Sequence, residues 1–108
     1  MTKKRHSKDY RNIRDDLIGQ LTRRGALTPV FVNLVDDYMA LYELQQLLIA
    51  DIAQNGIRIR YDNGGGQSGE KDNPSIQQRV RVNAQMLKIL AQLDITTDNV
   101  QDGEEDEL

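Results

Sequence analysis

Hydrophobic and polar residues recur with a helical period in three long stretches of the chain. The first stretch, residues 7–24, has an apolar residue at nearly every turn: Tyr10, Ile13, Leu17 and Leu21. This spacing places the four side chains on one face of an amphipathic helix. Ser7 stands where an N-cap is favoured, and Gly25 follows the last turn, where glycine commonly ends a helix. The pattern therefore predicts a helix over about residues 7–24.

The other two stretches each begin with a capping residue followed by proline. Thr28-Pro29 opens a predicted helix over residues 29–55, and Asn73-Pro74 opens another over residues 74–93. On both helices the apolar residues form two stripes, and so wide an apolar surface needs neighbours on more than one side. A chain of 108 residues supplies few such neighbours, so assembly into a helical oligomer is expected. The predicted oligomer interface consists of Leu34, Tyr38, Leu41, Leu48, Ile52, Val82, Met86 and Ile89.

A short segment between the second and third helices has a different pattern. Residues 57–61 alternate strictly between apolar and charged or polar side chains, which is typical of a half-exposed strand. Asp62-Asn63-Gly64 is a hairpin-type turn sequence, but the arm after it, residues 65–71, has no apolar alternation. We therefore expect a short strand or weak hairpin over about residues 57–71. The predicted fold class is mainly α, with three helices.

Charge divides the chain into three parts. Residues 1–25 have eight basic and three acidic side chains, whereas residues 94–108 have seven acidic side chains and no basic one. The net charge of -3 therefore conceals about +5 at one end and -7 at the other. We expect a basic N-terminal part (1–25), a helical oligomerisation core (26–95) with a glycine-rich loop (62–71), and a disordered acidic tail (96–108).

The residue types argue against an enzyme and against a cofactor. With no cysteine in the chain, disulfides and cysteine-based metal sites are excluded, and His6 is the only histidine. The segment Gly64–Lys71 superficially resembles a phosphate-binding loop, but Glu70 separates Gly69 from Lys71 and Asp72 follows. We therefore expect no catalytic residues, no metal, no cofactor and no nucleotide. No apolar run approaches the ~20 residues of a membrane span, so no membrane partner is expected.

The basic N-terminal part is the strongest functional signal. It is either a solvated helix surface or a surface that contacts the phosphates of nucleic acid. The candidates for DNA contact are Lys3, Lys4, Arg5, Lys8, Arg11, Arg14, Arg23 and Arg24. The acidic tail either keeps the chain soluble, binds a basic partner protein, or competes with DNA for the basic part. Its candidates for partner binding are Glu104, Glu105, Asp106 and Glu107.

The order of these segments resembles the small terminase subunits of bacteriophages and prophages, a family of DNA-packaging proteins. The resemblance covers about residues 8–95. It depends most on the loop Asp62-Asn63-Gly64-Gly65-Gly66-Gln67-Ser68-Gly69 and on the last helix with Asn83-Ala84-Gln85-Met86-Leu87-Lys88-Ile89-Leu90. One segment departs from the family pattern. Family members often end with a Leu-Gly-Leu-Thr-Pro segment and a following arginine, whereas this chain has Leu93-Asp94-Ile95-Thr96-Thr97.

The resemblance implies a non-enzymatic protein that acts in the cytoplasm of a bacterial host. Such a subunit binds double-stranded viral DNA, assembles as a ring, and recruits the large subunit that carries the ATPase and nuclease. The residues alone leave a second interpretation open, in which the chain is a small helical DNA-binding or regulatory protein of a prophage that acts as a dimer.

Overall fold

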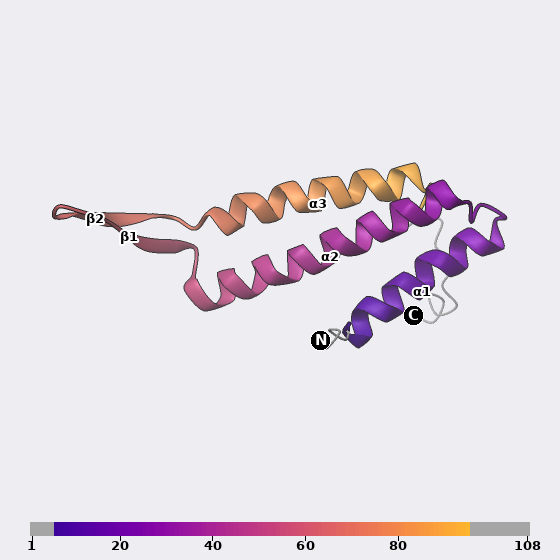
Figure 1. Cartoon of the computed structure of the whole chain (residues 1–108), viewed down its shortest axis with the longest axis horizontal. Coiled ribbons are helices and arrows are strands. Elements are labelled where there is room, and N and C mark those ends of the chain that lie inside the picture. Colours follow the sequence, from indigo (N-terminus) through magenta and orange to yellow (C-terminus); the bar gives the residue numbers. More distant parts are fainter. Residues whose placement is uncertain (1–5, 96–108) are drawn as a thin grey trace, which may run out of the picture.

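Three helices and one hairpin form the chain in the computed structural model, which describes residues 6–95. The order is α1 (Lys8–Arg23), α2 (Pro29–Asn55), β1 (Arg58–Gly64), β2 (Gln67–Asp72) and α3 (Pro74–Gln92). Helices α2 and α3 run antiparallel side by side, α1 folds back along the first half of α2, and the hairpin extends beyond the far end of the pair (Figure 1). The molecule is elongated, with extents of 62 × 42 × 24 Å. The predicted mainly helical class is confirmed.

The capping residues predicted from the sequence are all in place. The Ser7 hydroxyl accepts a hydrogen bond from the Tyr10 amide at 3.0 Å, and the Thr28 hydroxyl accepts one from the Phe31 amide at 3.3 Å. Asn73 caps α3, because its side-chain oxygen accepts from the Ser75 amide at 3.0 Å. These bonds satisfy amide groups that the first turn of a helix leaves without a partner.

The second arm of the hairpin is a regular strand, although its sequence lacks the apolar alternation of the first arm. Arg58 pairs with Asp72 and Tyr61 with Gly69, so the polar return arm is a full antiparallel strand. The tip glycines 64, 65 and 66 have φ values of 82°, 59° and 82°, which only glycine adopts readily. The glycine-rich loop therefore joins two antiparallel strands, whereas a phosphate-binding loop leads from a strand into a helix.

The best-packed core lies at the end of the molecule opposite the hairpin. Its buried side chains come from α1, α2 and the segment just after α3, and Ile89 and Leu90 of α3 pack against them. The buried residues are Leu17, Leu21, Val35, Met39, Leu93 and Ile95. After α3, Asp94 adopts φ 59° and the Ile95 amide donates to the Leu90 carbonyl at 2.9 Å. Asp94 and Ile95, which follow the end of the third predicted helix, therefore belong to the folded part.

A polar cluster at the other end of the α2–α3 pair fixes the base of the hairpin. Buried Asn73 donates to the Asp51 carboxylate at 3.0 Å and to the Gly56 carbonyl at 2.9 Å. Ser75 and Asn55 donate to the same carboxylate, each at 2.7 Å. These bonds hold the pKa of Asp51 below its usual value, with the bond from Ser75 as the largest cause. The cluster ties the last turn of α2 to the first turn of α3.

Asp51→Asn is expected to destabilise the chain at neutral pH and much less in acid. Because folding lowers the pKa of Asp51, the ionised carboxylate contributes stability above its unfolded value of 3.8. That contribution is lost as the pH falls below 3.8 and through the folded pKa. Urea unfolding from pH 7 to pH 2.5 measures the difference between the two proteins. A stability difference that does not shrink in acid would contradict this role for Asp51.

Candidate nucleic-acid and assembly surfaces

The basic residues predicted to contact DNA divide into three groups in the structure. Lys3, Lys4 and Arg5 lie outside the described residues. Lys8, Arg11 and Arg23 are exposed on α1, and the Arg11 guanidinium donates to the nearby His6 carbonyl at 2.6 Å. Arg14 and Arg24 make contacts with other elements of the chain.

Those intramolecular contacts tie α1 to the rest of the fold. The Arg14 guanidinium forms an ion pair with Asp36 of α2 at 3.1 Å. The Arg24 guanidinium donates to the carbonyls of Leu93 and Asp94, just after α3. Their charges remain, but their side chains have structural partners that a DNA phosphate would have to replace. Among the described residues of this part, Lys8 and Arg23 are therefore the better candidates. Arg11 is a candidate whose bond to the His6 carbonyl stays within the start of α1.

The described part of the first helix is nearly neutral. Between Lys8 and Arg23 it has four basic residues and three acidic ones, Asp9, Asp15 and Asp16, for a net charge of +1. Most of the positive charge of residues 1–25 therefore belongs to Lys3, Lys4 and Arg5, with Arg24 adding one. A DNA contact through this region depends on the segment that precedes α1.

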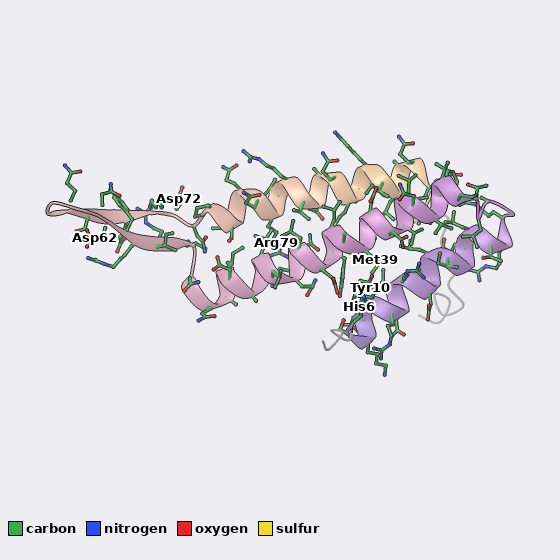
Figure 2. The ribbon with its side chains drawn as sticks, viewed as in Figure 1. His6, Tyr10, Met39, Asp62, Asp72 and Arg79 are labelled. Carbon is green, nitrogen blue, oxygen red and sulfur yellow. The ribbon has the colours of Figure 1, made fainter. Side chains whose placement is uncertain are left out.

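Aromatic and charged contacts hold the beginning of α1 against α2. His6 Nδ1 lies 2.6 Å from Glu43 Oε2, and the His6 ring stacks on Tyr10 with centroids 3.8 Å apart. Tyr10 in turn meets Tyr42 edge to face at 6.3 Å. Figure 2 shows His6 and Tyr10 together at the start of α1, beside α2. The amino-acid sequence alone does not indicate this contact, because Glu43 is 37 residues away from His6.

A second cationic surface lies on α3. This helix carries Arg79, Arg81 and Lys88 and no acidic residue, so its net charge is +3. All three side chains are exposed. Arg81 and Lys88 are seven residues apart, which places them about two turns apart on the same face. α3 is thus the main alternative to the N-terminal segment for a phosphate contact.

The residues predicted for the oligomer interface lie mostly inside the chain's own packing. Val82 and Met86 of α3 are buried against α2, and Leu34, Tyr38 and Ile89 pack against the core. Burial raises the pKa of the Tyr38 hydroxyl, and the neighbouring Tyr42 adds to this effect. Leu41, Leu48 and Ile52 are half-buried. The sequence showed that both helices need several neighbours, but α1 and the α2–α3 contact already supply some of them.

Other apolar residues remain open to solvent on the paired helices. The large exposed ones are Val30, Leu44 and Leu47 on α2 and Val80 and Leu87 on α3. A groove of about 550 Å³ also runs between the two helices near the hairpin. It is lined by Gln45, Ile52, Ile57, Ile76, Arg79, Val80 and Asn83, and Arg79 is labelled in Figure 2. This half of the α2–α3 pair lacks a cover from the described part of the chain.

Residues 6–95 were compared with the side-chain clusters that bind metal ions and with the helices that span membranes. This part of the chain has no group of three or more histidine, cysteine, aspartate or glutamate side chains that could hold a metal ion. Nor does any of its helices have the length and apolar character needed to cross a membrane. The features that stand out are cationic side chains and uncovered apolar helix surfaces.

Comparison with known proteins identifies a family. A family model described as phage terminase, small subunit, matches residues 11–101. No curated protein and no solved structure matches the chain significantly. The matched region includes nearly all of α1, the whole of α2, the hairpin and α3.

Proposed function

Because this chain belongs to the phage terminase small-subunit family, we propose that it is a DNA-packaging adaptor that acts as a ring in the cytoplasm of the bacterial host. It binds double-stranded viral DNA and brings in the large subunit, which supplies the ATPase and nuclease activities. The observation that carries this proposal is the family match across 91 of the 108 residues, 11–101.

The DNA contact is assigned to the basic segment before α1, together with Lys8 and Arg11. Lys3, Lys4 and Arg5 add three positive charges directly before His6. The contact between His6 and Glu43 holds the start of α1 on α2. Several copies in one ring would present this segment repeatedly, so weak individual contacts with phosphates add up through avidity. Such contacts favour DNA binding with little sequence preference and a steep dependence on salt.

The large subunit is assigned to the acidic tail. Residues 102–108 contain five carboxylate side chains and no basic residue. A basic surface on the large subunit would complement this charge. The tail lies outside the described residues, and the buried apolar side chains that the structure describes all lie between Leu17 and Ile95.

Deleting residues 102–108 is expected to weaken binding of the large subunit and to leave DNA affinity equal or higher. The reason for the second effect is that five negative charges are removed from a DNA-binding protein. The measurement is co-purification of the large subunit with the full chain or the truncated chain, alongside DNA titrations of both. A full-length control in which the five carboxylates become amides separates charge from length. Undiminished binding of the large subunit to both variants would contradict this role of the tail.

A further inference from the structure

Two exposed apolar stripes run along the paired helices. The α2 stripe consists of Ala40, Leu44 and Leu47, and the α3 stripe consists of Val80, Ala84, Leu87 and Ala91. Leu47 and Val80 are each 65% exposed, Leu87 is 58% exposed and Leu44 is 42% exposed. Scattered apolar residues on a surface need no explanation, but a helically spaced stripe of them indicates a missing neighbour.

Each stripe faces away from the chain's own packing. Successive helix residues are about 100° apart, so the α2 stripe lies about 120–180° from buried Val35. Around the axis of α3, the same count places the α3 stripe about 140–180° from Val82, which is buried against α2. Val80 also borders the groove beside Gln45 and Ile52 of α2, whereas the rest of the α3 stripe is on the side of α3 opposite Val82. No residue of the α2 stripe lines that groove, so the two stripes of one chain do not meet there.

We propose that the α2 stripe of one copy packs against the α3 stripe of the next copy, and that this contact builds the ring. The inference rests on the proposed function for the existence of an assembly, and it adds which surfaces meet. Within one chain α2 and α3 are antiparallel (Figure 1). Rotation about an axis along the helices keeps every α2 antiparallel to every α3, so the two stripes meet with opposite directions.

The side chains of the two stripes fit in this orientation. When Leu47 is opposite Val80, the spacing of three and four residues places Leu44 opposite Ala84. One turn further, it places Ala40 opposite Leu87. Each leucine therefore faces alanine or the smaller valine, and alternation of large and small side chains allows two helices to interlock closely.

Charge supports the same alignment. One turn further along the contact, Asp37 on α2 of one copy lies opposite Ala91 on α3 of the next copy. Lys88 of that next copy is one helical turn from Ala91. Both charged side chains are exposed, and neither forms an ion pair within residues 6–95. The proposed contact gives each of them a partner of opposite sign from the next copy.

Two different surfaces on one chain predict a ring. A two-fold dimer uses the same surface twice, whereas a contact between unlike surfaces leaves one of each open until the chain of copies closes. The occupant of each stripe is thus a second copy of this protein. Binding of a different protein, or a dimer made from one stripe alone, would be outcomes against the proposal.

The test uses Leu47→Glu and Val80→Glu, each of which puts a charge into one stripe only. Because both side chains are largely exposed, the helical circular-dichroism spectrum should be unchanged. Each variant alone is expected to dissociate to monomers in light scattering, because a buried unpaired carboxylate is costly. Gln85→Glu adds the same charge to an exposed site on α3 outside the stripe and should keep the wild-type assembly.

Mixing the two variants distinguishes unlike surfaces from like ones. L47E keeps an intact α3 stripe and V80E keeps an intact α2 stripe, so an equimolar mixture should form a 1:1 heterodimer and stop there. A mixture that remains monomeric, a single variant that assembles like wild type, or a monomeric wild type would overturn the proposal. DNA binding is measured in parallel. If the protein binds DNA but fails these assembly tests, the proposed packaging role is retained and only the proposed interface is rejected.

Discussion

Replacing Lys4, Arg5 and Lys8 together with glutamate is expected to weaken DNA binding on the order of a hundredfold near 0.1 M salt. Each phosphate contact contributes about 0.9 to the slope of log affinity against log salt, so loss of three contacts should lower the slope by about 3. The measurement is a DNA titration at several salt concentrations. The expected effect is large because the described part of α1 has a net charge of only +1.

A matched control reverses three other cations. Arg60, Lys71 and Arg81 are exposed, lie on the hairpin and α3, and are outside both proposed assembly stripes. This second triple variant should keep most of the affinity and most of the salt slope. If it loses affinity while the N-terminal variant does not, the DNA surface lies on the hairpin or α3.

Leu21→Ala is expected to destabilise the folded chain by roughly 2–5 kcal/mol, the range for truncating a buried leucine. Leu21 is fully buried among residues of α1, α2 and the end of α3. Urea unfolding of wild type and variant at one protomer concentration measures the change, because the proposed assembly would make stability depend on concentration. Val30→Ala on the exposed part of α2 is the control and should change stability by about 0.5 kcal/mol or less.

The outcome also decides how α1 relates to the paired helices. If Leu21 joins them in one core, wild type and variant should each unfold in a single transition. A variant that loses α1 helicity first, while α2 and α3 remain folded at wild-type stability, would show that α1 is a separate unit. The basic segment would then be tethered to the ring and would not be held at a fixed position on it.

Helix boundaries could be predicted from the sequence because local chemistry determines them. Thr28-Pro29 and Asn73-Pro74 start α2 and α3, and Gly56 ends α2 with a positive φ. The return strand Gln67–Asp72 was harder to predict because it has no apolar face of its own. Its conformation depends on pairing with β1, and pairing is not written in the pattern of one strand.

Long-range contacts account for the differences at the candidate surfaces. Periodicity identifies the apolar stripes of α3 but cannot decide which of them α2 covers, so the sequence predicts Val82 and Met86 in the oligomer interface. The structure buries them within the chain and leaves Val80 and Leu87 exposed. In the same way, the partner of Arg14 on α2 and the carbonyl partners of Arg24 after α3 required the folded arrangement. The charge of the N-terminal segment, by contrast, is visible in the sequence itself.

Native mass spectrometry of the wild-type chain with and without a short DNA duplex tests the central claim most directly. A packaging adaptor should appear as one closed species of more than two 12.3 kDa copies, and the same species should appear with one bound duplex. Monomers or dimers in both conditions, or an oligomer that never retains DNA at low salt, would contradict the account.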